Sequence, residues 1–195
     1  MLVIMHRLFC LFFVLMGFLN SFAEDASVLT GYWLTRKHDT NALSSVIYLS
    51  VDDNGQIIGR VVAGFYQEGQ PLPLRNCAMC SQYTQDGVYG LAKDQAILGS
   101  YPVWGFANNG QKSWVNGKVI RIKTGQLFNA NMELKDKNTL QLIVRFGFLS
   151  QSLIWERLSD KTYRSYCKGD LTGLTDDSSY RIHCLLDDAN RPIQP

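Results

Sequence analysis

Polar and hydrophobic residues alternate along most of the chain beyond residue 30. A period of two places every second side chain on the same face, which is typical of a β-strand buried on one side. The segment 126–135 shows this most clearly, with Phe128, Ala130, Met132 and Leu134 on one face. Strand-like segments of this kind lie at 31–35, 44–51, 56–66, 101–107, 113–123, 126–135, 139–147 and 152–158.

Short turn-forming sequences separate most of these segments. Asp-Asp-Asn-Gly at 52–55 and Asn-Asn-Gly at 108–110 are typical of turns that join antiparallel strands. No regular alternation of strands with helices and no heptad repeat is present. The pattern therefore predicts an all-β fold, in which about eight antiparallel strands form a meander that closes into a barrel and removes exposed edges.

Two stretches depart from the strand pattern. Residues 67–100 contain two prolines and then a Cys-x-x-Cys motif, and they predict a long cysteine-containing loop. Residues 159–195 are polar and rich in aspartate, and Cys167 and Cys184 bracket a predicted hairpin or loop. This second stretch predicts a small C-terminal appendage, followed by a tail that frays.

The N-terminus has the features of a secretory signal peptide. Arg7 precedes an apolar run from Leu8 to Leu19, and Ser21 and Ala23 are small residues before a cleavage point after Ala23. The alternative is a retained membrane anchor, but the apolar run is shorter than the roughly 20 residues that span a bilayer.

This N-terminus sets the predicted domain organisation. We expect a signal peptide at 1–23, a β-barrel domain at 24–158, and a disulfide-stapled C-terminal extension with its tail at 159–195. After cleavage one domain with a substantial core remains. The predicted location is exported, either periplasmic or secreted.

Charge narrows the range of partners. The chain has 19 Lys and Arg against 17 Asp and Glu, and removal of the signal takes away only Arg7, which leaves a net charge of +1. No basic stripe is visible, so we expect no nucleic-acid partner. No second long apolar run occurs, so we expect no transmembrane segment after signal removal. No protein partner can be named.

Four cysteines follow the predicted signal: Cys77, Cys80, Cys167 and Cys184. An even number in an exported chain predicts disulfides, for which three pairings exist. Proximity along the chain favours Cys77 with Cys80 and Cys167 with Cys184. The first pair closes a very small loop, so its expected effect is local.

Cys-x-x-Cys spacing also occurs in redox pairs and in zinc sites. A redox pair needs a thiolate at a helix N-terminus, but the preceding Gln-Pro-Leu-Pro-Leu-Arg-Asn at 70–76 is a proline-broken loop. A zinc site would need further ligands, for which Cys167, His183 and Cys184 are candidates, yet thiolate sites are less expected in an oxidising space. We therefore expect structural disulfides and no metal or cofactor.

Catalytic signatures are absent from the sequence. It contains no Gly-x-Ser-x-Gly, no His-Glu-x-x-His and no phosphate-binding loop. His38 lies in a polar turn and His183 precedes a cysteine, so both are expected to be structural. The sequence indicates no pair of side chains that could act as general acid and general base. We therefore expect no enzyme activity and name no catalytic residue.

Residues at the two ends of the strand region resemble a known barrel signature. Gly31-Tyr32-Trp33 opens the first segment, and Trp155-Glu156-Arg157 closes the last. Lipocalin-like barrels commonly pair a Gly-x-Trp on the first strand with an arginine on the last. The resemblance implies that the Arg157 guanidinium packs over Trp33 and closes one end of a lipocalin/calycin-like barrel.

More specifically, the chain resembles the DUF2147 family of exported bacterial proteins over roughly 31–158. The order and spacing of several short sequences carry this resemblance: GYWLT, IIGRVV, the Cys-x-x-Cys, AILG, SWVNGKVI and RFG…IWERL. The resemblance implies a lipocalin-like barrel, a periplasmic or secreted location and no established activity. Two family features differ, because the loop before the last tryptophan is shortened to RFGFLSQSLIW and a usual turn is replaced by KTG at 123–125.

Aromatic residues are the best candidates for a binding site. They either fill the barrel core or line a cavity at its mouth, where small apolar ligands bind. The candidates are Trp104, Phe106, Trp114, Phe128 and Phe146. The leading hypothesis is thus a non-enzymatic barrel that binds a small hydrophobic or amphipathic ligand. The alternative is a protein-interaction module that acts through 67–100 and the C-terminal extension.

Overall fold

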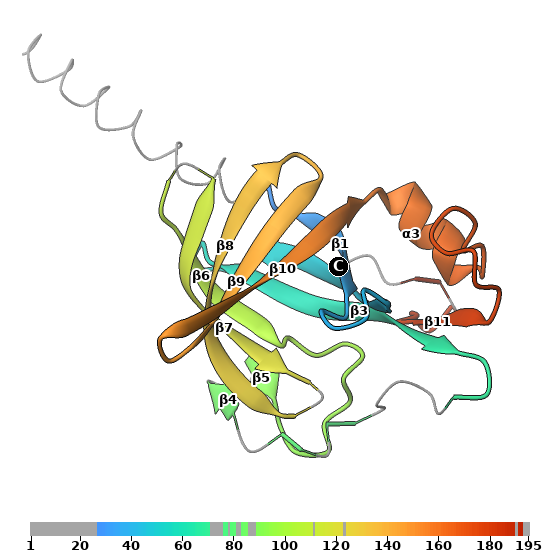
Figure 1. Ribbon diagram of the computed structural model, residues 1–195, viewed down its shortest axis with the longest axis horizontal. Helices are drawn as coiled ribbons and strands as arrows, with labels where there is room; N and C mark the ends of the chain where they lie inside the picture. Colours follow the sequence, from blue (N-terminus) through green and yellow to red (C-terminus); the bar gives the residue numbers. More distant parts are fainter. Residues whose placement is uncertain are drawn as a thin grey trace, which may run out of the picture.

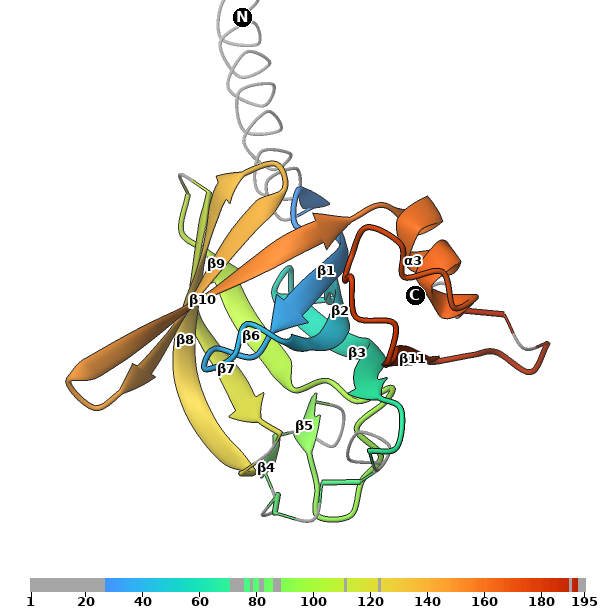
Figure 2. The same cartoon turned by 45° about the vertical axis from the view of Figure 1, so that its right-hand side comes forward.

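A closed antiparallel β-barrel of eight strands forms the body of the protein, as the sequence predicted (Figures 1 and 2). The computed structural model describes residues 27–70, 76–77, 79–80, 83–85, 89–110, 112–122, 124–189 and 191–192, so the predicted signal peptide lies outside the described residues. The barrel strands are β1 (Gly31–Arg36), β2 (Leu43–Val51), β3 (Ile57–Gln67), β6 (Val103–Asn108), β7 (Ser113–Arg121), β8 (Gln126–Asp136), β9 (Thr139–Phe146) and β10 (Leu149–Leu158).

Consecutive strands pair in a meander, and two further pairings close the ring. β1 pairs with β10, and the first part of β3 pairs with β6, both antiparallel. Polar turn residues stabilise the connections as expected. In the turn between β2 and β3, Asp52 Oδ1 accepts hydrogen bonds from the backbone N–H groups of Asn54 and Gln56.

Alternation along the strands fills the barrel interior with apolar side chains. On β8, Phe128, Ala130, Met132 and Leu134 are buried, each 6 % exposed or less. They belong to a large cluster that includes side chains from all eight barrel strands and from the loop that follows β3. The barrel interior is therefore the main hydrophobic core.

A second hydrophobic cluster covers the outer face of β1, β2 and β3. The C-terminal extension contains helix α3 (Asp160–Cys167) and strand β11 (Tyr180–Cys184), which are joined by the predicted loop at 168–179, and β11 pairs with the second half of β3. Tyr163 of α3 is fully buried, and its hydroxyl donates to the carbonyl oxygen of Val62, 3.1 Å away. The extension thus packs on the barrel and buries part of its wall (Figure 2).

The long loop after β3 also packs on the barrel. It carries the short hairpin of β4 (Tyr83–Gln85) and β5 (Tyr89–Leu91). Leu91, Ile97 and both cysteines of the Cys-x-x-Cys motif are buried in the main core. Cys77 Sγ lies 3.5 Å from the carbonyl oxygen of Ile122, and Gly125 approaches the Met79 backbone so closely that a Cβ would lie 2.1 Å from its carbonyl oxygen. The loop therefore lies against the turn between β7 and β8 (Figure 1).

Candidate ligand-binding interior

Arg157 lies near one end of the barrel, and its guanidinium is 4.2 Å from the centre of the Trp33 ring. Arg157 Nε donates to Lys137 O, Nη1 to Thr30 O and Nη2 to Val28 O, at 2.7, 3.0 and 2.6 Å. The indole N–H of Trp33 donates to Leu29 O at 2.9 Å. Partial burial lowers the pKa of Arg157 below its usual value. The cation is thus held by a ring face and by backbone carbonyls.

The five aromatic residues nominated from the sequence gather in the barrel interior. Trp104, Phe106, Trp114 and Phe128 are buried, and Phe146 is half-buried against them. They come from four consecutive strands of the meander. The ring of Phe106 lies over Gly117, where a Cβ would come within 2.3 Å of its carbon atoms. This glycine makes room for the ring, so much of the interior near it is filled by protein atoms.

Trp114 has a polar atom that stands out in this apolar interior. Its side chain is 1 % exposed. Of the buried side-chain nitrogen and oxygen atoms in the described part of the chain, Trp114 Nε1 alone has no hydrogen-bond partner. A buried donor left without an acceptor costs about 1–3 kcal/mol. Trp33 differs, because its N–H donates to the carbonyl oxygen of Leu29.

The opposite end of the barrel carries an arginine that the sequence reasoning missed. The guanidinium of Arg121 lies 5.3 Å from the ring centres of both Phe128 and Phe146, which are themselves 4.6 Å apart. Arg121 Nη2 also reaches Gln151 Oε1 at 3.5 Å. A cation stacked on two interior rings gives this end a polar rim. In the sequence, Arg121 lies near the end of the predicted strand at 113–123, and this position was the feature that could have indicated an arginine at the barrel rim.

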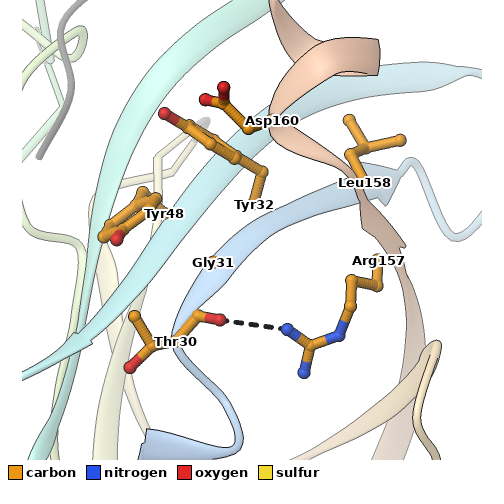
Figure 3. A pocket seen from close by; sticks show the side chains of 7 residues that line it. All are labelled: Thr30, Gly31, Tyr32, Tyr48, Arg157, Leu158 and Asp160. Atoms are coloured by element: carbon orange, nitrogen blue, oxygen red, sulfur yellow. Dashed lines mark hydrogen bonds between the residues drawn. The ribbon is translucent and has the colours of Figure 1, made fainter.

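A shallow hollow of about 420 Å³ lies on the outer face of the barrel, beside the Arg157 end (Figure 3). Its lining residues are Thr30, Gly31, Tyr32, Tyr48, Arg157, Leu158 and Asp160. Figure 3 shows the Tyr32 hydroxyl directed toward Asp160 and Arg157 directed toward Thr30. The sequence did not indicate this hollow, because the hollow depends on where α3 places Asp160.

Two tyrosines packed beneath α3 have raised pKa values, so the stability of the fold depends on pH in the alkaline range. The Tyr32 ring stacks on Tyr163 at 4.1 Å between centres. Burial, and then the nearby Asp160 carboxylate, raise the pKa of Tyr32 from 10.0 to about 12. Burial, and then Tyr32, raise the pKa of Tyr163 as well. Because the folded state favours the protonated phenol, its contribution to stability is complete at pH values below the unfolded pKa of 10.0. This contribution is lost as pH rises from 10.0 toward the folded pKa of about 12.

We therefore expect the free energy of unfolding to fall as pH rises from about 10 to about 12. Urea titrations at a series of alkaline pH values measure this slope. Tyr32→Phe should flatten the slope, and Asp160→Asn should make the decline smaller and end it at a lower pH, because without the carboxylate the pKa of Tyr32 in the folded state lies closer to its unfolded value. A slope that stays the same in Tyr32→Phe would contradict this account.

The four cysteines form two disulfides, Cys77–Cys80 and Cys167–Cys184. Each of these four sulfur atoms is therefore bonded to another sulfur atom, and His183 lies exposed on β11. Within the described ranges, no group of three or more histidine, cysteine, aspartate or glutamate side chains is arranged to hold a metal ion. In the same ranges, no helix combines the length and apolar character that crossing a membrane requires.

A comparison with protein-family models finds a match over most of the barrel strands. A family model described as an uncharacterized protein conserved in bacteria, DUF2147, matches residues 31–157, which is more than half of the chain. The chain belongs to the DUF2147 family. The matched residues run from Gly31, the first residue of β1, to Arg157 near the end of β10, so the DUF2147 region coincides with the barrel strands.

A comparison with the curated proteins finds no match. Among solved structures, the chain is similar to a Helicobacter pylori protein that is described as belonging to the lipocalin family. The two share 15 % identity with a TM-score of 0.49, and the similarity covers 68 % of this chain and 84 % of the other.

Proposed function

We propose that this DUF2147 barrel binds one small, mostly apolar molecule that carries a hydrogen-bond acceptor for Trp114 Nε1. The observation that carries the proposal is the buried indole N–H, which has no acceptor among the described residues. In an apolar interior an unsatisfied donor is costly, and a ligand acceptor would remove that cost. The surrounding aromatic and aliphatic side chains supply the apolar contacts of a ligand pocket.

Side-chain volume limits the ligand. An eight-stranded barrel is just wide enough for one small ligand, and the Phe106 ring already occupies the space over Gly117. A molecule that enters must therefore be small or must displace Phe106 by a change of rotamer. Entry past Arg157 is disfavoured, because Arg157 is bonded to three backbone carbonyls and packed on Trp33.

The proposed setting is an exported protein. Two disulfides support it, since such bonds form and persist in oxidising compartments. An exported barrel would meet its ligand in the bacterial envelope or outside the cell. The first experiment is therefore native mass spectrometry of the protein recovered from the envelope of its own host, followed by organic extraction of the bound material. A ligand-free mass in every preparation would overturn the proposal.

Trp114→Phe tests the role of the donor directly. Phenylalanine keeps an aromatic ring but lacks the N–H, so we expect affinity for the co-purified ligand to fall about fivefold to tenfold, the worth of one hydrogen bond. Ligand retention in native mass spectrometry, measured at a series of dilutions, reports this change. Met132→Leu is the matched control, because Met132 lies opposite Trp114 in the β7–β8 register and the exchange conserves volume.

The stability of the ligand-free variants completes the test. Trp114→Phe removes an unsatisfied buried donor, which offsets part of the packing lost with the smaller ring. If Trp114→Phe binds the ligand as tightly as Met132→Leu does, the indole N–H has no part in binding.

A further inference from the structure

The first half of β10 has a neighbouring strand on one side only. β9 pairs with β10 from Leu149 to Glu156, whereas β1 pairs with β10 only from Glu156 to Leu158. In both views the β9–β10 hairpin extends beyond the barrel wall (Figures 1 and 2). The edge of β10 from Ser150 to Ile154 therefore faces away from β9 without a paired strand among the described residues.

The register of the hairpin shows which backbone groups are free. Phe146 pairs with Leu149 across the two-residue turn Gly147-Phe148, so these two residues exchange backbone hydrogen bonds. Antiparallel pairing alternates, so the N–H and C=O groups of every second residue point toward β9 and those of the others point away. The outward groups belong to Ser150, Ser152 and Ile154. They form a row of donors and acceptors that another strand can meet.

The side chains along this edge are unusual for an exposed strand. Phe148 is 97 % exposed, Leu149 60 % and Ile154 49 %. The run from Gly147 to Trp155 contains no charged residue and no proline. Natural proteins commonly protect a free edge with lysine, proline or a bulge, and this edge has none of them. Edge and apolar side chains together indicate a surface that is covered by a partner.

We propose that a second copy of this chain covers the edge, with β10 of each copy pairing antiparallel about a two-fold axis at Ser152. Ser152 then lies opposite the partner's Ser152, and Ser150 lies opposite the partner's Ile154. In this register the outward-pointing backbone N–H and C=O groups of each copy form hydrogen bonds with those of the other copy. Phe148 falls diagonally beside the partner's Ile154, which covers two of the three exposed apolar side chains.

Self-complementarity favours a second copy over an unrelated strand. No like charges meet in the proposed register, because the whole run is uncharged. The hairpin extends beyond the barrel wall (Figure 2), so the edge of β10 is accessible to a second copy. A five-residue strand and a few apolar side chains bury less than the roughly 1,200 Å² of a stable interface, so the dimer is weak and reversible. The interface is distinct from the loop at 67–100 and from the C-terminal extension.

Two cysteine variants test the register, each made in the full-length gene and purified as the host processes the protein. In a hydrogen-bonded antiparallel pair the Cα atoms lie about 5.5 Å apart, within the range that a disulfide bridges. Ser152→Cys should therefore form a covalent dimer under mild oxidation. Ser150→Cys is the matched control, since its two copies lie roughly 13 Å apart along the strands, beyond the reach of a disulfide. Equal cross-linking of both variants would overturn the register.

Sedimentation equilibrium tests the dimer without added cysteines. We expect the wild-type mass to rise toward the dimer as the concentration increases into the hundreds of micromolar, on the order of a weak interface. Ile154→Lys should shift the dissociation constant upward at least about tenfold, because it removes the apolar contact with the partner's Phe148 and places a charged side chain on the pairing edge. Val51→Lys, at an exposed position of β2 away from this edge, should leave it unchanged. A wild-type protein that stays monomeric throughout, or that binds only a different chain from its host, would refute the dimer.

Discussion

Replacement of Arg157 by methionine should lower the free energy of unfolding by about 2–4 kcal/mol. Arg157 donates to Thr30 O, Val28 O and Lys137 O and packs on Trp33. Methionine retains part of the packing but leaves these carbonyls without their donor. Since two of the three carbonyls belong to the segment that precedes β1, its attachment to the barrel should weaken as well.

Urea unfolding followed by tryptophan fluorescence measures this effect. Arg157→Lys separates charge from shape, because an ammonium cannot stack as a planar group or reach three carbonyls in a fixed geometry. We expect it to recover less than half of the loss. Arg36→Met is the control, because Arg36 forms a partly exposed ion pair with Glu156 at 3.2 Å that contributes less than about 1 kcal/mol. Similar losses in Arg157→Met and Arg36→Met would contradict the role given to Arg157.

Much of the barrel could be predicted from local pattern. The alternation at 126–135 reappears as β8, and seven other predicted segments match barrel strands to within a few residues. Such segments are predictable because each needs only one buried face and a turn at each end. The position of Arg157 over Trp33 was expected from resemblance rather than from pattern, since neither residue by itself indicates its partner.

The C-terminal extension was harder to predict because its structure depends on the barrel. α3 is only eight residues long, and β11 finds its partner 117 residues or so earlier, along β3. The sequence held one indirect signal. Tyr32 and Leu34 flank Trp33 on β1, so both faces of that strand are apolar, and both faces are buried. A strand with two apolar faces indicates that something covers the outer wall.

The candidate site was only partly predictable for a similar reason. Composition nominates aromatic residues such as Trp114 and Phe128, and burial brings them together. Whether an indole N–H finds an acceptor depends on the register of distant strands. The free edge of β10 likewise depends on where β1 stops pairing with it, which no feature of Leu149–Trp155 reveals.

Removal of the Cys167–Cys184 disulfide, by replacing both cysteines with alanine, should lower the free energy of unfolding by about 3 kcal/mol. The two residues are 17 apart in the sequence. A disulfide that closes a loop of this size lowers the conformational entropy of the unfolded chain by an amount worth about 3 kcal/mol. The bond joins α3 to β11, the two elements that cover the outer wall of β1 to β3. Its loss should therefore destabilise the barrel as well as the extension.

Tryptophan fluorescence distinguishes these two effects, because all four tryptophans lie in the barrel core. If the extension and the barrel unfold together, the fluorescence midpoint in urea shifts with the disulfide. The Cys77→Ala and Cys80→Ala pair is the comparison, because these residues are only three apart and their bond restrains the unfolded chain by less than about 2 kcal/mol. An unchanged fluorescence midpoint in the Cys167→Ala and Cys184→Ala variant would mean that residues 159–195 fold separately from the barrel. If the fluorescence midpoint of the Cys167→Ala and Cys184→Ala variant shifts more than that of the Cys77→Ala and Cys80→Ala variant, the extension and the barrel unfold as one cooperative unit. The reason is that the lost bond can affect the core only through the packing of α3 and β11 on the barrel.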